Sequence, residues 1–196
     1  MRTLIHLATA AVLTAAVACV HAEAPTMKSD DRATHRETAL AALDASFGVD
    51  AGRRVLRIEY SVKNTSAAPL MVLDGGVELG GKLAAGGAAP LGKMDGETLT
   101  LTRAATALPK PTPTVPRVTL ASRLEPGASR SSKFDADVPP GVKRVRYCIG
   151  AAPFAEDAFT PLEADTALWR ASFGVAATQT LICTAWFDLA TNHFSD

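Results

Sequence analysis

Apolar and polar residues alternate most regularly over residues 55–64, which predicts a β-strand with one buried face. A polar segment, residues 64–68, leads through Pro69 into a second apolar run at residues 70–73. Asn, Ser and Thr side chains in such segments bond to the nearby backbone and stabilise turns. We therefore expect the two strands to join in a hairpin or in a corner between two sheets.

Shorter alternating stretches recur along the chain, separated by turn signals. Two Asp-Gly sites, at Asp74 and Asp95, predict tight turns, because this dipeptide favours short hairpins. The four prolines of residues 109–116 predict an extended crossover at a sheet edge, since proline cannot donate to a ladder. Further strands are expected at residues 43–49, 117–124, 131–138, 143–149 and 178–187.

This pattern, with no long helical period after the N-terminal region, is typical of an all-β domain. A chain of 196 residues is long enough for one domain with a sizeable core. We therefore expect a single antiparallel β-sandwich of about eight to ten short strands. The pentapeptide of residues 45–49 recurs at residues 171–175, and coincidence explains this as well as a true repeat does. We use the recurrence only to favour a strand over a helix at residues 167–175.

The first 22 residues have the pattern of a secretory signal peptide, with a basic start, an apolar stretch and a small-residue end. Cleavage after Ala22 is favoured, because cleavage after Ala24 would leave Pro25 beside the scissile bond. In the alternative, residues 16–19 resemble a bacterial lipobox, and Cys19 becomes the site of lipid attachment. We thus expect a periplasmic or secreted protein, with a membrane-anchored lipoprotein as the alternative.

The rest of the chain divides into two expected parts. Residues 23–37 are polar and lack an apolar period, which predicts a flexible N-terminal arm. Residues 38–196 form the expected β-sandwich domain. No stretch after the signal peptide reaches the roughly 20 apolar residues that a transmembrane span needs.

Cys148 and Cys183 remain after removal of the signal peptide, and an exported chain is exposed to oxidising conditions. We therefore expect them to form a disulfide, with two buried free thiols as the alternative. The chain-entropy model assigns such a bond about 4 kcal/mol for a loop of this length. A redox-active pair is disfavoured, because redox cysteines usually lie two residues apart at a helix N-terminus.

The charge balance and the sparse histidines exclude several classes of function. The chain carries 20 basic and 20 acidic side chains, which argues against binding to nucleic acid. His35 and His193 lie near opposite ends and match no zinc or copper spacing, so we expect no metal and no cofactor. Residues 76–82 and 87–93 come close to a phosphate loop but lack the Ser or Thr that binds magnesium.

No catalytic residue can be assigned from the sequence. A Ser-His-acid arrangement would require His193 to fold back from the C-terminal end. Residues 151–166 predict a Pro-punctuated loop, and this loop would hold the site if the protein were a periplasmic hydrolase or carbohydrate-acting protein. Its acidic residues are Glu156, Asp157, Glu163 and Asp165.

One set of strand and turn positions has a spacing found in a known class of domain. The set consists of Leu56, Ile58, Tyr60, Val62, Asn64 and Ser66, then Pro69 and Leu70, and later Leu124, Pro126 and Gly127. It resembles exported bacterial immunoglobulin-like domains, over about a third of the mature chain, and implies an immunoglobulin-like sandwich with a binding or scaffold role.

The leading functional expectation is an exported, non-catalytic β-sandwich protein. It would bind a protein or an envelope component through an edge strand or through the loops at one end. The alternative is the hydrolase or carbohydrate-acting protein with its site at residues 151–166.

Overall fold

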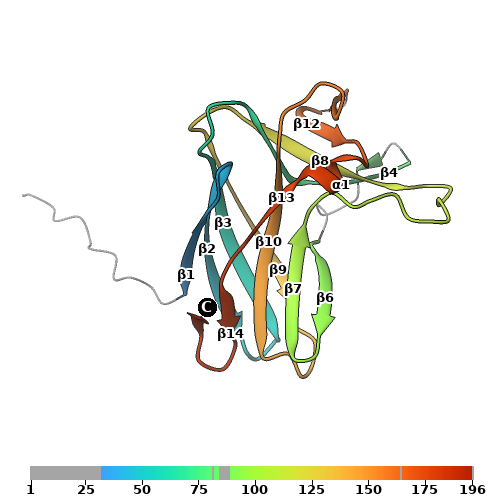
Figure 1. Cartoon of the computed structure of the whole chain (residues 1–196). Helices are drawn as coiled ribbons and strands as arrows, with labels where there is room; N and C mark the ends of the chain where they lie inside the picture. The colour runs from blue at the N-terminus through green and yellow to red at the C-terminus, as the bar shows by residue number, and fades with distance from the viewer. Residues whose placement is uncertain (1–31, 81, 84–88, 164, 196) are drawn as a thin grey trace, which may run out of the picture.

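The computed structural model describes residues 32–80, 82–83, 89–163 and 165–195, and these residues form two packed β-sheets (Figure 1). The expected all-β sandwich is confirmed. The described part contains fifteen strands, more than the expected eight to ten, because several are short pieces at the sheet edges. The expected signal peptide and its two alternative processing sites, at Cys19 and Ala22, lie outside the described residues.

The smaller sheet, sheet A, has four antiparallel strands in the order β1-β2-β3-β9. The expected flexible arm is wrong for its last five residues, because these form β1 and pair with β2 along their whole length. The sequence of β1 is too polar to show an apolar period, and it is ordered by its backbone ladder. The bounds are β1 Ala33–Glu37, β2 Ala41–Asp50, β3 Val55–Asn64 and β9 Ser129–Asp137.

The larger sheet, sheet B, has eleven strands and is mixed. Its long strand β10 pairs antiparallel with β4, β13 and β14 but parallel with β7. The parallel pair arises because the chain passes through β8 and β9 between these two strands. The bounds are β4 Leu70–Leu79, β5 Lys82–Leu83, β6 Leu91–Asp95, β7 Thr98–Arg103, β8 Arg117–Leu124, β10 Arg144–Pro153, β11 Phe159–Leu162, β12 Asp165–Ala171, β13 Thr180–Cys183, β14 Trp186–Asp188 and β15 His193–Ser195, with one short helix, α1 Val175–Thr178.

The segment after β3 forms the corner expected from the sequence, because β3 belongs to sheet A and β4 to sheet B. Asn64 is fully buried at this corner. Its Nδ2 donates to Ala68 O at 2.8 Å and to Leu124 O at 3.0 Å. Its Oδ1 accepts from Ser66 N at 2.9 Å and from Ser66 Oγ at 2.8 Å. One amide side chain therefore ties together three segments of the corner.

Of the two expected Asp-Gly turns, one is confirmed and one is wrong. The site at Asp95 closes the β6–β7 hairpin, and Gly96 has a positive φ of 55°. At Asp74 the strand β4 continues instead, and its register with β8 shifts between Val72 and Gly76. This shift is a β-bulge, in which Gly76 adopts a φ of 98° that glycine tolerates without strain.

The expected loop at residues 151–166 is also wrong, because β10 extends to Pro153 and the hairpin of β11 and β12 follows. The strand expected at residues 167–175 ends at Ala171, and the recurring pentapeptide runs on into α1. The recurrence is therefore not a structural repeat. The last expected strand is divided into β13 and β14 at Thr184 and Ala185.

The main hydrophobic core lies between the two sheets, and a second cluster covers part of sheet B. The first includes Phe47, Ile58, Tyr147 and Phe187. The second contains Val175 of α1, so the short helix covers one face of sheet B at this end (Figure 1). The fold is thus a sandwich with one additional small layer.

Glu78 of β4 is a buried carboxylate that pairs with Arg170 of β12. Arg170 donates through Nη2 to Oε1 at 2.9 Å and through Nε to Oε2. The hydrogen bond from Arg170 holds the pKa of Glu78 below its ordinary value, although burial acts in the opposite direction. A carboxyl whose pKa is lower in the folded state stabilises the fold at neutral pH, and this stabilisation is lost as the pH falls through the folded pKa.

We therefore expect the free energy of unfolding of the wild type to fall below pH about 4.3, the ordinary glutamate value. Glu78→Gln should show a smaller decrease, because glutamine does not titrate. Urea unfolding of both proteins over a series of pH values measures the difference. Parallel pH profiles would contradict the stabilising role of the Glu78 carboxylate.

Candidate binding site at an open edge of the sandwich

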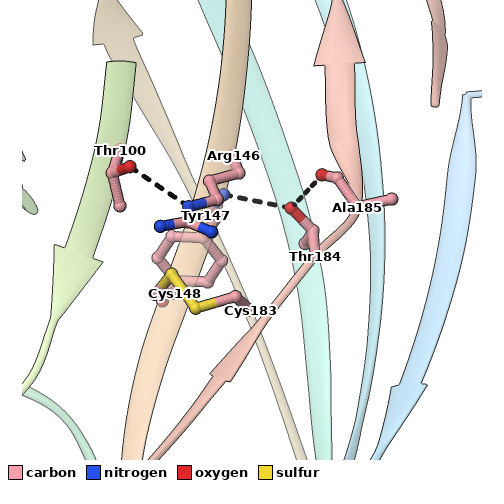
Figure 2. The surroundings of a disulfide bond; sticks show 7 residues. All are labelled: Thr100, Arg146, Tyr147, Cys148, Cys183, Thr184 and Ala185. Carbon is pink, nitrogen blue, oxygen red and sulfur yellow. Dashed lines mark hydrogen bonds between the residues drawn. A yellow bond between two sulfur atoms is a disulfide. The ribbon is translucent and has the colours of Figure 1, made fainter. Parts of the chain in front are cut away.

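Cys148 and Cys183 form the expected disulfide, which joins neighbouring strands of sheet B (Figure 2). The two residues lie directly opposite each other on β10 and β13, with their Cα atoms 4.0 Å apart. Beside the bond, Thr184 N donates to Tyr147 O at 2.9 Å, and Tyr147 N donates to Thr184 Oγ1 at 3.1 Å. The disulfide therefore lies within a hydrogen-bonded ladder, which is consistent with a structural role for this bond.

The outer face of sheet B near the disulfide carries an arginine stacked on a tryptophan. Arg146 Cζ lies 4.5 Å from the centre of the Trp186 ring. Arg146 Nε donates to Thr100 Oγ1 at 3.2 Å (Figure 2). Thr100 belongs to β7 and Trp186 to β14, and both strands pair with β10. The arrangement fixes the surface of three neighbouring strands.

The acidic residues that defined the alternative enzyme site lie apart from any metal-binding arrangement. Glu156, Asp157 and Glu163 are exposed. In the described ranges, no three His, Cys, Asp or Glu side chains gather closely enough to hold a metal ion. The same ranges contain no helix that is long and apolar enough to cross a membrane.

An open groove of about 810 Å³ runs over the outer face of sheet A. His35 Nδ1 lies 2.7 Å from Asp44 Oδ1 within it, so the backbone pair of β1 and β2 is joined by a side-chain contact. The side chains that line the groove include the hydroxyl and ionisable groups of Ser46, Ser61, Ser131, His35, Asp44, Glu59 and Lys133. Its border on one side is the edge strand β9.

Strand β9 presents a regular backbone edge. It pairs with β3 over nine residues without a bulge, and on its other side it has no strand partner in the described part of the chain. Val138 N donates to Arg54 O and Asn64 N donates to Ala128 O, each at 2.9 Å, at the two ends of this ladder.

Bonded and non-bonded pairs alternate in an antiparallel ladder. Because the bonded pairs at both ends involve even-numbered residues, the even-numbered residues of β9 bond to β3. The backbone N–H and C=O groups of the odd-numbered residues therefore point away from β3, toward the free edge. These residues are Ser129, Ser131, Lys133, Asp135 and Asp137.

Strand β6 of sheet B is exposed along its whole length. Met94 lies opposite the buried Leu99 and therefore faces the core side of the sheet, yet 44% of its surface is exposed. Gly92 faces the same side, because a Cβ added there would lie 3.5 Å from Leu99 Cδ1. The core-facing side of β6 is thus left uncovered by the described strands of sheet A.

The interior next to this edge contains an arginine between aromatic rings. Arg103 of β7 donates through Nη1 to Tyr60 Oη at 3.0 Å, and its Cζ lies 4.7 Å from the centre of the Phe134 ring. Tyr147 Oη and Arg103 Nε are buried without a hydrogen-bond partner in the described residues. Burial is the main cause that raises the pKa of Tyr147 well above its ordinary value, so its hydroxyl remains protonated.

An ion pair between a buried carboxylate and an arginine joins the two sheets at the same side of the core. Asp74, which the bulge of β4 carries into the interior, accepts from Ser122 Oγ and from Arg130 Nε, both at 2.9 Å. Arg130 belongs to β9, so this contact fixes the edge strand against sheet B. The edge of β9 is therefore held in place although its outer side is unpaired.

No family model, curated protein or solved structure matches this chain. Its function must therefore be argued from its own geometry. Sequence reasoning identified the disulfide but missed the open edge. The signal for a strand at β9 was present, whereas the order of strands that makes β9 an edge is not encoded in any local pattern.

Proposed function

We propose that this protein is an exported, non-catalytic β-sandwich protein of immunoglobulin-like type that binds a protein partner of the cell envelope. The partner would pair with the free edge of β9. This mode of recognition, in which an extended segment adds a strand to a sheet, obtains its affinity from backbone hydrogen bonds. The uninterrupted nine-residue ladder of β9 carries the proposal, because it leaves a matching row of backbone groups unpaired on its outer side.

The disulfide between Cys148 and Cys183 supports the export part of the proposal. Disulfides persist in oxidising compartments such as the periplasm and are rare in the cytosol. Export fits both readings of the N-terminal region, cleavage after Ala22 and lipid attachment at Cys19. In either case the sandwich would work outside the cytoplasmic membrane.

The composition of β9 also supports a controlled binding edge. Lys133 places an exposed positive charge on the strand, and such charges limit the uncontrolled pairing of exposed edges. Ser129 and Ser131 are short, so their side chains leave the neighbouring backbone accessible. The edge is therefore protected against aggregation and remains open to a specific partner.

We expect Ser131→Pro to weaken partner binding without unfolding the protein. Proline removes the outward-pointing N–H of residue 131, and this N–H makes no bond to β3. The test is crosslinked capture from an envelope extract with the tagged, exported full chain. Recovery of the partner should fall at least about tenfold relative to the wild type.

Ser131→Ala is the matched control, because it changes the same side chain and keeps the N–H. It should recover the partner as well as the wild type does. Thermal unfolding of all three proteins checks that the fold is intact. Equal recovery by Ser131→Pro, or no reproducible partner with the wild type, would contradict the proposal.

A further inference from the structure

Sheet B extends one strand further than sheet A on the side of β9. The Tyr60 ring of β3 and the Phe134 ring of β9 lie 5.0 Å and 5.2 Å from the Tyr147 ring of β10. Arg103 of β7 also lies over Phe134. Strands β3 and β9 thus face β10 and β7, and beyond them sheet B continues with β6 (Figure 1).

A strand added to sheet A beside β9 would occupy the position opposite β6. Neighbouring strands lie about 4.8 Å apart, and packed sheets lie about 10 Å apart. One wall of this position is the free backbone edge of β9. The other is the core-facing side of β6, where Met94 is 44% exposed and Gly92 carries no side chain.

The two faces of an added strand would have different surroundings. The core-facing residues of β9 next to the position include Phe134 and Ala136, which are half-buried against the main core. Together with Met94 they offer an apolar surface to one face of an added strand. On the opposite face, an added strand would continue the polar row of Ser131 and Lys133 and meet solvent.

We propose that the partner contributes a single extended segment that completes sheet A beside β9, with apolar side chains at alternate positions facing β6 and polar side chains facing solvent. This inference rests on the proposed function and specifies its partner. Because Gly92 leaves space on the wall of β6, a large apolar side chain of the segment lies opposite it. The segment is up to nine residues long, the length of β9.

A second copy of this chain does not fit the same position. In the second copy, β7 lies opposite that copy's β9. If the two β9 strands paired, this β7 would occupy the same space as β6 of the first copy. The two larger sheets would then overlap. The occupant is therefore a strand that has no covering sheet of its own on that side.

The test uses a display library of random nine-residue segments, selected on the exported full chain. Gly92→Leu is the key variant. An added Cβ at Gly92 would make only ordinary contacts with Leu99 and Leu101, so we expect the variant to fold. The leucine side chain would then occupy the space that the segment's apolar side chain needs. Gly48→Leu is the matched control, since a Cβ at Gly48 of β2 meets nothing within 4 Å. Ser131→Pro removes the edge N–H.

We expect the wild type and Gly48→Leu to enrich segments with apolar residues at alternate positions. Gly92→Leu should bind the enriched segments at least about tenfold more weakly, because one large apolar side chain loses its site. Ser131→Pro should weaken them as well.

Two results would overturn this inference and leave edge pairing intact. Either the enriched segments are weakened by Ser131→Pro but lack alternating apolar residues, or they bind Gly92→Leu as tightly as the wild type. If the enriched segments bound Ser131→Pro as tightly as the wild type, or if no segment were enriched, edge pairing would be overturned too. A wild-type dimer in analytical ultracentrifugation that Ser131→Pro dissociates would identify a second copy as the occupant and overturn the inference.

Discussion

Replacing Asn64 with alanine is expected to lower the free energy of unfolding by about 3 kcal/mol. The Asn64 side chain is fully buried and makes four hydrogen bonds at the corner between the sheets. Alanine would leave Leu124 O without this donor inside the protein, and an unsatisfied buried acceptor costs more than the net value of the lost bond. Equilibrium unfolding in urea measures the change.

Ser66→Ala is the matched control for this prediction. Ser66 is only half-buried, and its single O–H lies within hydrogen-bond distance of Asn64 Oδ1 and Ala68 O but makes no bond to the buried Leu124 O. Its loss should cost about 1 kcal/mol. If Asn64→Ala destabilised the protein no more than Ser66→Ala, the corner would depend on its backbone contacts and not on the buried amide.

The corner at Asn64 also shows where sequence reasoning succeeds. Alternation identified β3, and the polar segment after it indicated a change of direction, because both signals act over a few neighbouring residues. The hairpin at Asp95 was predictable for the same reason. The disulfide followed from the expected compartment and from the number of cysteines, without any knowledge of the fold.

Errors arose where distant residues decide the local structure. Asp74 was expected in a turn, but pairing with β8 continues β4 through the bulge, and Arg130 of the other sheet neutralises the buried carboxylate. Strand β1 has no apolar period and is defined by its partner β2. The parallel pairing of β7 with β10 depends on a crossover that no short window contains.

The candidate site belongs to this second class. The strand at β9 was predicted, yet its free edge exists because no described strand follows it in sheet A. Exposure of Met94 on the core-facing side of β6 is likewise a property of two sheets of unequal width. A binding edge is therefore a feature of strand order, which sequence patterns specify only weakly.

Loss of the disulfide is expected to lower the free energy of unfolding by about 4 kcal/mol, the largest effect predicted for this protein. The sequence separation of Cys148 and Cys183 is 35, so the bond restricts a long loop in the unfolded chain. In the folded state β13 pairs with β10 over only four residues before the break at Thr184. Urea unfolding of the wild type and of the double variant Cys148→Ala, Cys183→Ala measures the difference.

Reductant provides the internal control, because it should bring the wild type close to the double variant and leave the variant unchanged. If reduction did not change the urea concentration at the unfolding midpoint of the wild type, the disulfide would not stabilise the fold. Domains of this size are commonly stable by about 5–15 kcal/mol, so a loss of about 4 kcal/mol is a large share of the total. The C-terminal strands, and with them β10 at the centre of sheet B, would then be firmly held only where the cysteines stay oxidised.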